Sequence, residues 1–275
     1  MFKKVAIVGT GLIGGSLALA IKKKGLAQEV VGVSRHQQSL NLAKRMGAID
    51  RGSRDLGIIR GSELLILATP IEVMLSLAPK IAKFVSDDCL VTDTGSTKNV
   101  LVNKLEELFV NFVGSHPLAG SEKTGIANAG ADLLRHSLCI LTPTKRTPQQ
   151  ALRKITLFWQ KLGARIVLVE PRLHDKILSF TSHLPHMVAF SLLNAIPPNF
   201  LKFSAGGLKD MTRIASSDAQ LWADIFLSNR RNVLRAISLF QANLLQIKQA
   251  IQDGDRESLL RLLRQASSKR GRLER

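Results

Sequence analysis

The sequence of 275 residues contains no tyrosine, 2 cysteines, 2 tryptophans, and 21 acidic residues against 39 basic ones. Without tyrosine, no phenol can serve as an acid, a base or a stacking partner in any site of this chain. So few cysteines exclude a disulfide-stapled fold, and 9 prolines with 20 glycines exclude a collagen-like chain. An apolar content of 45% excludes an intrinsically disordered one. The length fits one large domain or two modest ones.

Targeting signals and long apolar runs are also lacking. The N-terminus begins with basic residues and an apolar run, as a signal peptide does, but four glycines between residues 9 and 15 interrupt it. No segment reaches 18 uninterrupted apolar residues, so we expect no membrane span. Cys89 and Cys139 stand far apart in apolar stretches, which favours buried thiols in a reducing compartment. We therefore expect a cytoplasmic protein.

The shortage of acidic residues leaves a formal net charge of +18. Such a charge fits three partners: nucleic acid, an acidic membrane surface or anionic small ligands. The basic residues are spread along the chain and concentrate only in the tail, Arg261–Arg275. They are not interleaved with aromatic residues and form no nucleic-acid-reading motif. We therefore expect a small anionic ligand, and neither nucleic acid nor membrane as a partner.

The first two-thirds of the chain alternates short apolar runs with segments of helical periodicity. This pattern predicts a mainly parallel sheet built from right-handed βαβ units. The expected strands are Lys4–Val8, Glu29–Val33, Leu64–Ala68, Cys89–Thr92, Phe112–Gly114, Ser137–Thr142 and Arg165–Val169. We predict an α/β fold whose residues 1–170 form a Rossmann-type dinucleotide-binding domain.

Residues 171–275 show helical patterns and no convincing strand. Leu173–Ala195 reads as one helical stretch that Pro185 kinks. Asp218–Gln252 carries apolar residues at helical spacing over many turns, and Arg256–Ala266 is a last helix. A long helix with a broad apolar stripe needs a partner surface. We therefore predict an all-α second domain that forms a homodimer through its helices.

A glycine-rich turn, Gly9-Thr10-Gly11-Leu12-Ile13-Gly14, follows the first predicted strand and opens a helix. The first glycine permits the tight turn, the second lets the backbone approach a pyrophosphate, and the third allows close packing of helix on strand. The helix N-terminus, including Leu12 and Ile13, then faces the phosphates. A purely structural glycine turn is the alternative to dinucleotide binding.

The second strand ends at Val33-Ser34-Arg35-His36, where NAD-preferring domains carry a carboxylate for the ribose 2′-hydroxyl. No carboxylate is present there. Arg35 can pair with a 2′-phosphate, and Ser34 can donate a hydrogen bond to it. We therefore predict NADP as the cofactor, with NAD as the alternative if Arg35 is merely a solvated residue after a strand.

Four other segments are rich in functional groups: residues 93–98, 114–123, 182–186 and 206–213. His116 follows a predicted strand, and an imidazole suits a general base near neutral pH, although a surface histidine is the alternative. His183 and His186 are spaced like a metal pair, but Pro185 lies between them and no third ligand is near. We therefore expect no metal site.

The last of these segments carries Lys209 and Arg213, with Trp222 downstream. These side chains form either a solvated helix face or a clamp for an anion. Taken together, the segments GTGLIGGSLA, DTGSTK, HPLAGSEKTG, HDKILSFTSHLPH and GGLKDMTRIASSDAQLWADIF resemble the prephenate/arogenate dehydrogenase family of tyrosine biosynthesis. The resemblance covers nearly the whole chain, with the motifs in the same order.

This resemblance implies NAD(P)-dependent oxidative decarboxylation of prephenate, with arogenate as the alternative substrate. It implies that His116 accepts the hydroxyl proton, that Ser96 hydrogen-bonds the hydroxyl and the histidine, and that Arg213 holds a substrate carboxylate. It also places Thr69 at the nicotinamide end of the cofactor. By the same comparison the substrate site includes His186, Lys209, Ser121, Glu122 and Trp222.

Two questions stay open at this stage. Glu122 could pair with the amine of arogenate, but equally with Lys123 or Arg213. A β-hydroxyacid-type dehydrogenase would also join a glycine turn to a helical domain, although the longer glycine spacing around its catalytic lysine is missing here. The resemblance further implies that the helical half is a dimerisation domain.

Overall fold

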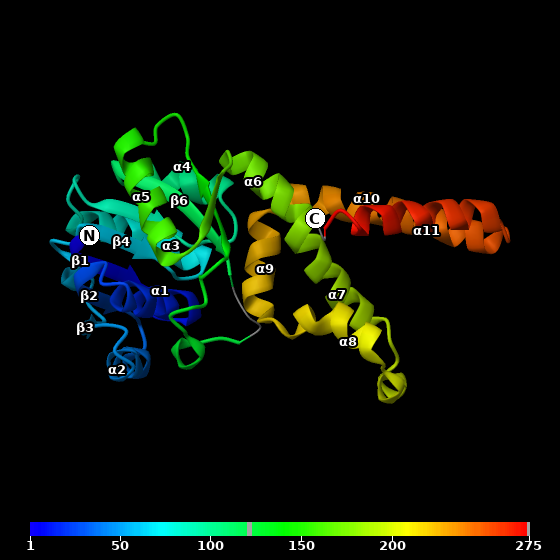
Figure 1. The fold of residues 1–275 in the computed structure, drawn as a ribbon, viewed down its shortest axis with the longest axis horizontal. Helices are drawn as coiled ribbons and strands as arrows, with labels where there is room; N and C mark the ends of the chain where they lie inside the picture. The colour runs from blue at the N-terminus through cyan, green and yellow to red at the C-terminus, as the bar shows by residue number, and fades with distance from the viewer. Residues whose placement is uncertain (120–122, 274–275) are drawn as a thin grey trace. The chain divides into compact units, whose positions relative to one another are not determined.

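The computed structural model describes residues 1–119 and 123–273 (Figure 1). The chain divides into two compact units, Met1–Asn229 and Arg230–Arg275. The first unit contains the sheet and the helices around it, and the second is a pair of helices. The domain boundary expected near residue 170 coincides with the end of the sheet rather than with the division between these units, and it stays a prediction.

The sheet has eight strands in the order β3-β2-β1-β4-β5-β6-β7-β8. All neighbouring strands are parallel except β6 and β7. The first six follow the strand order of dinucleotide-binding folds. The strands are β1 (Phe2–Val8), β2 (Ala27–Val33), β3 (Arg51–Ser53), β4 (Leu64–Leu67), β5 (Leu90–Asp93), β6 (Asn111–Leu118), β7 (Leu138–Thr142) and β8 (Arg165–Leu168).

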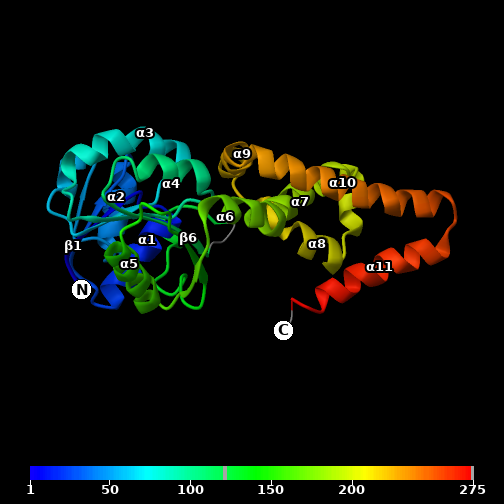
Figure 2. The same cartoon turned by 90° about the horizontal axis from the view of Figure 1, so that it is seen from above.

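Helices on both faces bury the sheet, as the near-continuous apolar strands require. They are α1 (Leu12–Lys23), α2 (Gln37–Arg45), α3 (Ile71–Ile81), α4 (Asn99–Leu105) and α5 (Gln149–Leu162), with short helical turns at Leu56–Ile59, Ala82–Phe84 and Ile126–Asn128. Helices α1 and α5 lie on one face of the sheet and α3 and α4 on the other (Figure 2). Val5 and Ile7 of β1 share a core with α1 and α5, whereas Ala6 and Val8 share one with α3 and α4. Both cysteines are buried and unbridged.

The register of the paired strands shows which strand ends lie together along the carboxyl edge of the sheet. Val8 pairs with Val33 on one side and with Leu67 on the other, and Leu67 pairs with Asp93. The carboxyl ends of β1, β2, β4 and β5 therefore lie along one edge of the sheet. In open α/β sheets ligands bind outside this edge, and the segments that follow these four strands carry most of the predicted site.

The rest of the first unit is helical. It comprises α6 (Pro171–Leu178), a π-helical turn (Ser179–His183), α7 (Leu184–Asn194), a 3₁₀ turn (Pro198–Phe203), α8 (Gly206–Thr212), a 3₁₀ turn (Arg213–Ser216) and α9 (Ala219–Ser228). The second unit consists of α10 (Arg230–Gln252) and α11 (Arg256–Arg270). No helix in the described part of the chain is long and apolar enough to cross a bilayer.

Several element boundaries differ from those expected. Strand β6 continues through His116 to Leu118 instead of ending at residue 114, because it pairs with β7 along that whole length. The stretch over 173–195 is interrupted by the π-helical turn just before Pro185, whose ring cannot follow a regular helix. The stretch over 218–252 is two helices, separated at Asn229.

Candidate active site

The turn between β1 and α1 depends on its glycines. Gly9 has a φ of +104°, and a side chain there would lie 2.5 Å from the Ala68 carbonyl oxygen. A Cβ atom on Gly14 would lie 1.9 Å from the Gly9 carbonyl oxygen, so helix α1 packs against the turn only with glycine at this position. Nothing lies within 4 Å of the equivalent point on Gly11, which leaves space for a ligand beside the backbone.

Two hydroxyls beside this turn support a ligand there. The side-chain oxygens of Thr10 and Thr69 are buried, and no hydrogen-bond partner for them is found in the described part of the chain. Buried polar groups are normally paired, so such oxygens point to a partner outside the protein. The turn, the first amides of α1 and these hydroxyls together fit the diphosphate and the nicotinamide ribose of a dinucleotide.

The end of β2 lies next to the glycine turn, since the Gly9 N–H donates to the Val33 carbonyl over 2.8 Å. Ser34 is half-buried, and its hydroxyl oxygen accepts the His36 N–H at 3.2 Å. Arg35 is exposed, and its Nε lies 2.8 Å from His36 Nε2. This contact leaves the two terminal guanidinium nitrogens as the pair that could bind a phosphate.

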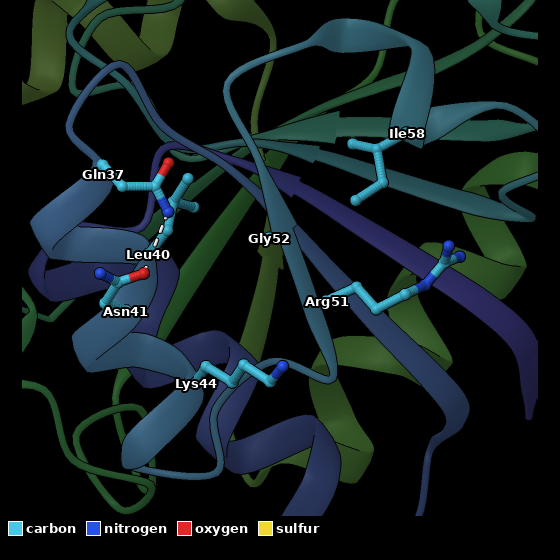
Figure 3. A pocket seen from close by; sticks show the side chains of 7 residues that line it. All are labelled: Gln37, Leu40, Asn41, Lys44, Arg51, Gly52 and Ile58. Atoms are coloured by element: carbon cyan, nitrogen blue, oxygen red, sulfur yellow. Dashed lines mark hydrogen bonds between the residues drawn. The ribbon is translucent and has the colours of Figure 1, made fainter.

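A hollow of about 410 Å³ lies nearby, between α2 and β3 (Figure 3). It is lined by residues such as Gln37, Lys44 and Arg51, and by none of the predicted site residues. Arg51 pairs with Glu29 at 2.6 Å, so this cation is already neutralised. We assign no role to this hollow.

The larger cavity, of about 710 Å³, begins at the glycine turn and extends over the carboxyl edge of the sheet to helices α6, α7 and α9. It collects predicted residues that lie far apart in the sequence: Leu12, Ile13, Thr69, Ser96, His116, His186, Arg213 and Trp222. Lys209 is exposed on α8 and does not line this cavity. Ser121 and Glu122 lie outside the described residues.

His116 occupies β6, where Pro117 follows it and the strand pairs with β7. A buried ion pair between Asp93 and Lys98 joins the two ends of the loop that carries Ser96. Asp93 accepts the N–H of Gly95 at 2.7 Å and that of Ser115 at 3.1 Å. This carboxylate therefore joins the loop that carries Ser96 to the strand that carries His116.

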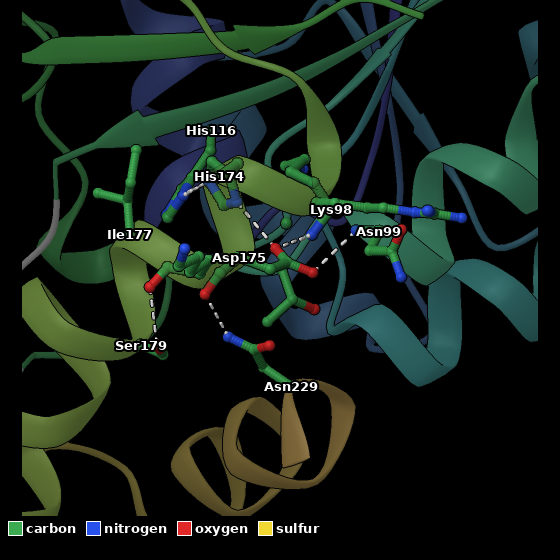
Figure 4. Close-up of polar contacts among 12 residues, drawn as sticks. Lys98, Asn99, His116, His174, Asp175, Ile177, Ser179 and Asn229 are labelled. Carbon is green, nitrogen blue, oxygen red and sulfur yellow. Dashed lines mark hydrogen bonds and ion pairs between the residues drawn. The ribbon is translucent and has the colours of Figure 1, made fainter. Parts of the chain in front are cut away.

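Two residues to which the sequence assigned no role complete this cluster (Figure 4). His174 and Asp175 lie on α6 and are buried. His116 Nδ1 lies 2.9 Å from His174 Nε2, and His174 Nδ1 lies 2.8 Å from Asp175 Oδ1. Both residues begin the segment HDKILSFTSHLPH that carried the family resemblance, but the contact of His174 to His116 spans 58 residues, so no local pattern indicated it.

A stacked pair of rings forms another part of the cavity wall. The rings of His186 and Trp222 lie 3.5 Å apart between centroids and 21° from parallel. His186 Nδ1 is 2.9 Å from the Ser182 carbonyl oxygen, so this nitrogen donates and Nε2 is the remaining polar atom of the ring. His183 Nδ1 lies 3.2 Å from the side-chain amide of Asn229. Across the described residues, no three metal-binding side chains gather.

Burial dominates the titration of these rings. It lowers the pKa of His116 well below the usual range, and positive charge on His174, Lys98 and His183 would lower it further. Burial lowers the pKa of His183 to about 4. It also lowers the pKa of His186, with Arg213 adding a further decrease. At neutral pH these rings are therefore uncharged, as a base that accepts a proton must be.

We expect the free energy of unfolding to fall as the pH is lowered from about 7 to about 5. The folded-state pKa of His116, His174, His183 and His186 is depressed, so the unfolded chain binds protons that the folded chain does not. The stability is present above the unfolded pKa of about 6.5 and is lost as the pH falls toward the folded values. Urea titrations across this range measure the slope.

The variant His183→Gln removes one of these groups and should reduce that slope by a fraction of a kcal/mol per pH unit near pH 7, rising toward a limit of about 1.4 kcal/mol per pH unit near pH 5. His136 is exposed, so His136→Gln should leave the slope as it is. An unchanged slope in His183→Gln would show that this ring is not protected from protonation in the folded protein.

Comparisons with known proteins agree on one family. The model of the prephenate dehydrogenase nucleotide-binding domain matches residues 17–168, and that of the prephenate dehydrogenase dimerization domain matches residues 170–265. The chain is 34% identical to prephenate dehydrogenase of Bacillus subtilis, covering 97% of this chain and 75% of that one. It is 36% identical to cyclohexadienyl dehydrogenase of Zymomonas mobilis, covering 93% and 91%.

A solved structure shows the same fold over the whole chain. It is the prephenate dehydrogenase from A. aeolicus in complex with hydroxyphenyl propionate and NAD+. The TM-score is 0.94 at 35% identity, and the match covers 99% of each chain. The α/β fold and the helical region that follows are therefore shared with that protein.

Proposed function

Because the chain belongs to the prephenate dehydrogenase family, we propose that it catalyses the oxidative decarboxylation of prephenate to 4-hydroxyphenylpyruvate in tyrosine biosynthesis. The observation that carries this proposal is the cavity that joins a dinucleotide turn to His116, Ser96 and Arg213. A nicotinamide dinucleotide held at the glycine turn would supply the acceptor for the hydride on the ring carbon that bears the hydroxyl. The remaining steps need a base, an orienting donor and anion clamps, and this chain offers candidates for each.

In the proposed mechanism His116 takes the hydroxyl proton as the hydride leaves. The ring carboxylate then departs as CO₂, and its bonding electrons make the ring aromatic, with negative charge on the former hydroxyl oxygen. His116 returns the proton to that oxygen, so no net proton is released. Ser96 hydrogen-bonds the hydroxyl and orients it toward His116. The buried, uncharged state of His116 supports its role as the base.

The anionic groups of the substrate need cations, and Arg213 supplies one at the cavity wall. We propose that its guanidinium binds a carboxylate through paired hydrogen bonds. The His186–Trp222 stack supplies a flat surface and one ring nitrogen beside it. Lys209, Ser121 and Glu122 stay in the proposed substrate site on the family resemblance alone, because Lys209 lies outside the cavity and the other two are not described.

We propose a homodimer formed through the C-terminal helices. The match to the family's dimerization domain over residues 170–265 supports it. Helix α10 also carries large apolar side chains that are about half exposed in the single chain. They are Leu234, Leu239, Leu244, Leu245 and Ile251. A surface of this kind is typical of an interface.

A spectrophotometric assay at the nicotinamide absorption band tests the reaction. Prephenate and arogenate are each offered with NAD and with NADP. We expect turnover with prephenate, and the relative rates show whether arogenate is also accepted. No turnover with either substrate would refute the proposed function.

We propose NADP as the preferred cofactor, since Arg35 and Ser34 stand where a carboxylate would select NAD. The A. aeolicus relative was solved with NAD+, so the preference has to be measured on this chain. Arg35→Ala should lower kcat/KM for NADP about 10–100-fold, because it removes a charge-assisted pair, and should change the value for NAD little.

Arg135→Ala is a matched control, since Arg135 is exposed beside Gly163 and lines neither cavity. It should leave both values of kcat/KM unchanged. A wild-type protein that clearly prefers NAD would overturn the assignment to NADP.

A further inference from the structure

The buried chain of side chains behind His116 constrains where the imidazole protons lie. We propose that His174 and Asp175 are positioning residues that keep the proton of neutral His116 on Nδ1 and leave Nε2 unprotonated for the substrate. The proposal rests on the proposed role of His116 as the base, and it explains why the nitrogen that faces the substrate is free of a proton. Figure 4 shows these residues with their hydrogen bonds.

The direction of each hydrogen bond follows from Asp175. Its Oδ1 accepts the backbone N–H of Lys98 at 2.7 Å, and its Oδ2 accepts that of Asn99 at 2.9 Å. An ionised carboxylate only accepts hydrogen bonds, so His174 Nδ1, 2.8 Å away, carries a proton and donates it.

The tautomer of His174 in turn fixes that of His116. A neutral imidazole with its proton on Nδ1 can only accept at Nε2. His174 Nε2 lies 2.9 Å from His116 Nδ1, so His116 Nδ1 is the donor. The lone pair of neutral His116 is then on Nε2. Because Nδ1 is engaged with His174, Nε2 is the nitrogen left to meet a ligand in the cavity that His116 lines.

The charges of the buried cluster suit a His116 ring that is positively charged during part of the proposed catalytic cycle. The charged side chains buried in the described part of the chain, leaving histidines aside, are Asp93, Lys98 and Asp175. Asp93 and Lys98 neutralise each other in an ion pair, which leaves the single negative charge of Asp175. A second proton on His116, taken from the substrate, gives the ring a positive charge that balances the negative charge of Asp175. His174 connects His116 to Asp175 through hydrogen bonds.

A structural role alone is the competing explanation. The two amides bound by Asp175 are at the start of α4, where helix amides lack partners within the helix. Asn229 also donates from its side chain to the Asp175 carbonyl oxygen at 2.7 Å. Replacing Asp175 would remove the acceptor of both amides and would thus disturb packing as well as proton placement, whereas the bond from Asn229 goes to the backbone and would remain. His174 makes neither of these contacts and is the more informative position for substitution.

The first test measures the tautomer directly and needs no substrate. Long-range ¹H–¹⁵N correlation spectra of histidine-labelled protein distinguish Nδ1–H from Nε2–H rings, and His116→Asn assigns the signal of residue 116. We expect an Nδ1–H ring at position 116 in the wild type and loss of that preference in His174→Leu. An Nε2–H ring in the wild type, or the same tautomer in His174→Leu, would overturn the proposal.

The second test is a rescue experiment. His174→Leu should lower kcat about 10–100-fold with little change in KM, because binding groups stay in place while the base loses its correct tautomer. His174→Gln should recover most of the activity, since its amide can donate to Asp175 and accept from His116. Equal activity of both variants and the wild type would contradict the proposal.

Thermal unfolding and dinucleotide binding show whether each variant is folded. If His174→Leu does not fold, the tautomer of His116 in the wild type and the activity of His174→Gln still test the proposal. The two hypotheses fail in different ways. A wild-type protein that turns over neither substrate refutes the proposed function, whereas an active wild-type protein with an Nε2–H ring at position 116 refutes only this inference.

Discussion

Replacing His116 with asparagine should lower kcat about 10²–10⁴-fold, the usual contribution of a general base. His116 lies on β6 at the cavity wall, and burial keeps its ring uncharged at neutral pH. Asparagine can still donate a hydrogen bond toward His174, so the cluster and the cavity should persist. KM for the substrate should therefore change little. Steady-state kinetics with saturating cofactor measures both constants.

The control for this substitution is His136→Asn. His136 is exposed, has a φ of +62°, and does not line the cavity. Asparagine tolerates this backbone conformation better than most residues do, so kcat should equal that of the wild type. Turnover by His116→Asn within a few-fold of the wild type would exclude His116 as the base, and the proton would need another acceptor in the cavity.

Replacing Arg213 with alanine should raise KM for the substrate roughly 10–100-fold, the effect of losing a hydrogen-bonded pair of charges. Arg213 follows α8 and lines the cavity, where its charge also helps lower the pKa of His186. If it grips a carboxylate equally in the ground and transition states, kcat changes much less than KM. Initial rates over a range of substrate concentrations separate the two constants.

Two variants test the clamp more finely. Arg213→Lys keeps the charge but loses the planar pair of donors, so its KM should lie between those of the wild type and Arg213→Ala. Arg153→Ala removes an exposed cation from α5, away from the cavity, and controls for the general field of the positive chain. An unchanged KM in Arg213→Ala would exclude Arg213 as the clamp.

Local patterns were enough to predict most of the first unit. The alternation of apolar runs and helical segments predicted seven of the eight strands in the described chain, and the glycine turn predicted the start of α1. The strand missed was β3, whose three residues, Arg51–Ser53, carry no apolar side chain. The length of β6 was also missed, because it depends on pairing with β7, which lies beyond the Phe112–Gly114 run that suggested the strand.

The site residues were predicted one by one from motifs. In the structure, some of them line the cavity and others do not. Ser96, His116, His186, Arg213 and Trp222 line one cavity, and their roles in it stay predictions. Lys209 is exposed on α8 and does not line it. A motif reports which residues occur together along the chain, but not on which side of a helix each one lies.

The sequence by itself determined the class of fold, the dinucleotide turn and the family. The first two depend on patterns among neighbouring residues, and the family depends on several such motifs and their order along the chain. Only the tertiary structure decided which groups form the hydrogen-bonded chain behind His116. His116 itself, the His174–Asp175 pair on α6 and the backbone amides that orient the Asp175 carboxylate come from three separate segments of the chain. A hydrogen bond acts over about 3 Å, so these contacts exist only once folding has brought the segments together, and no local pattern records them.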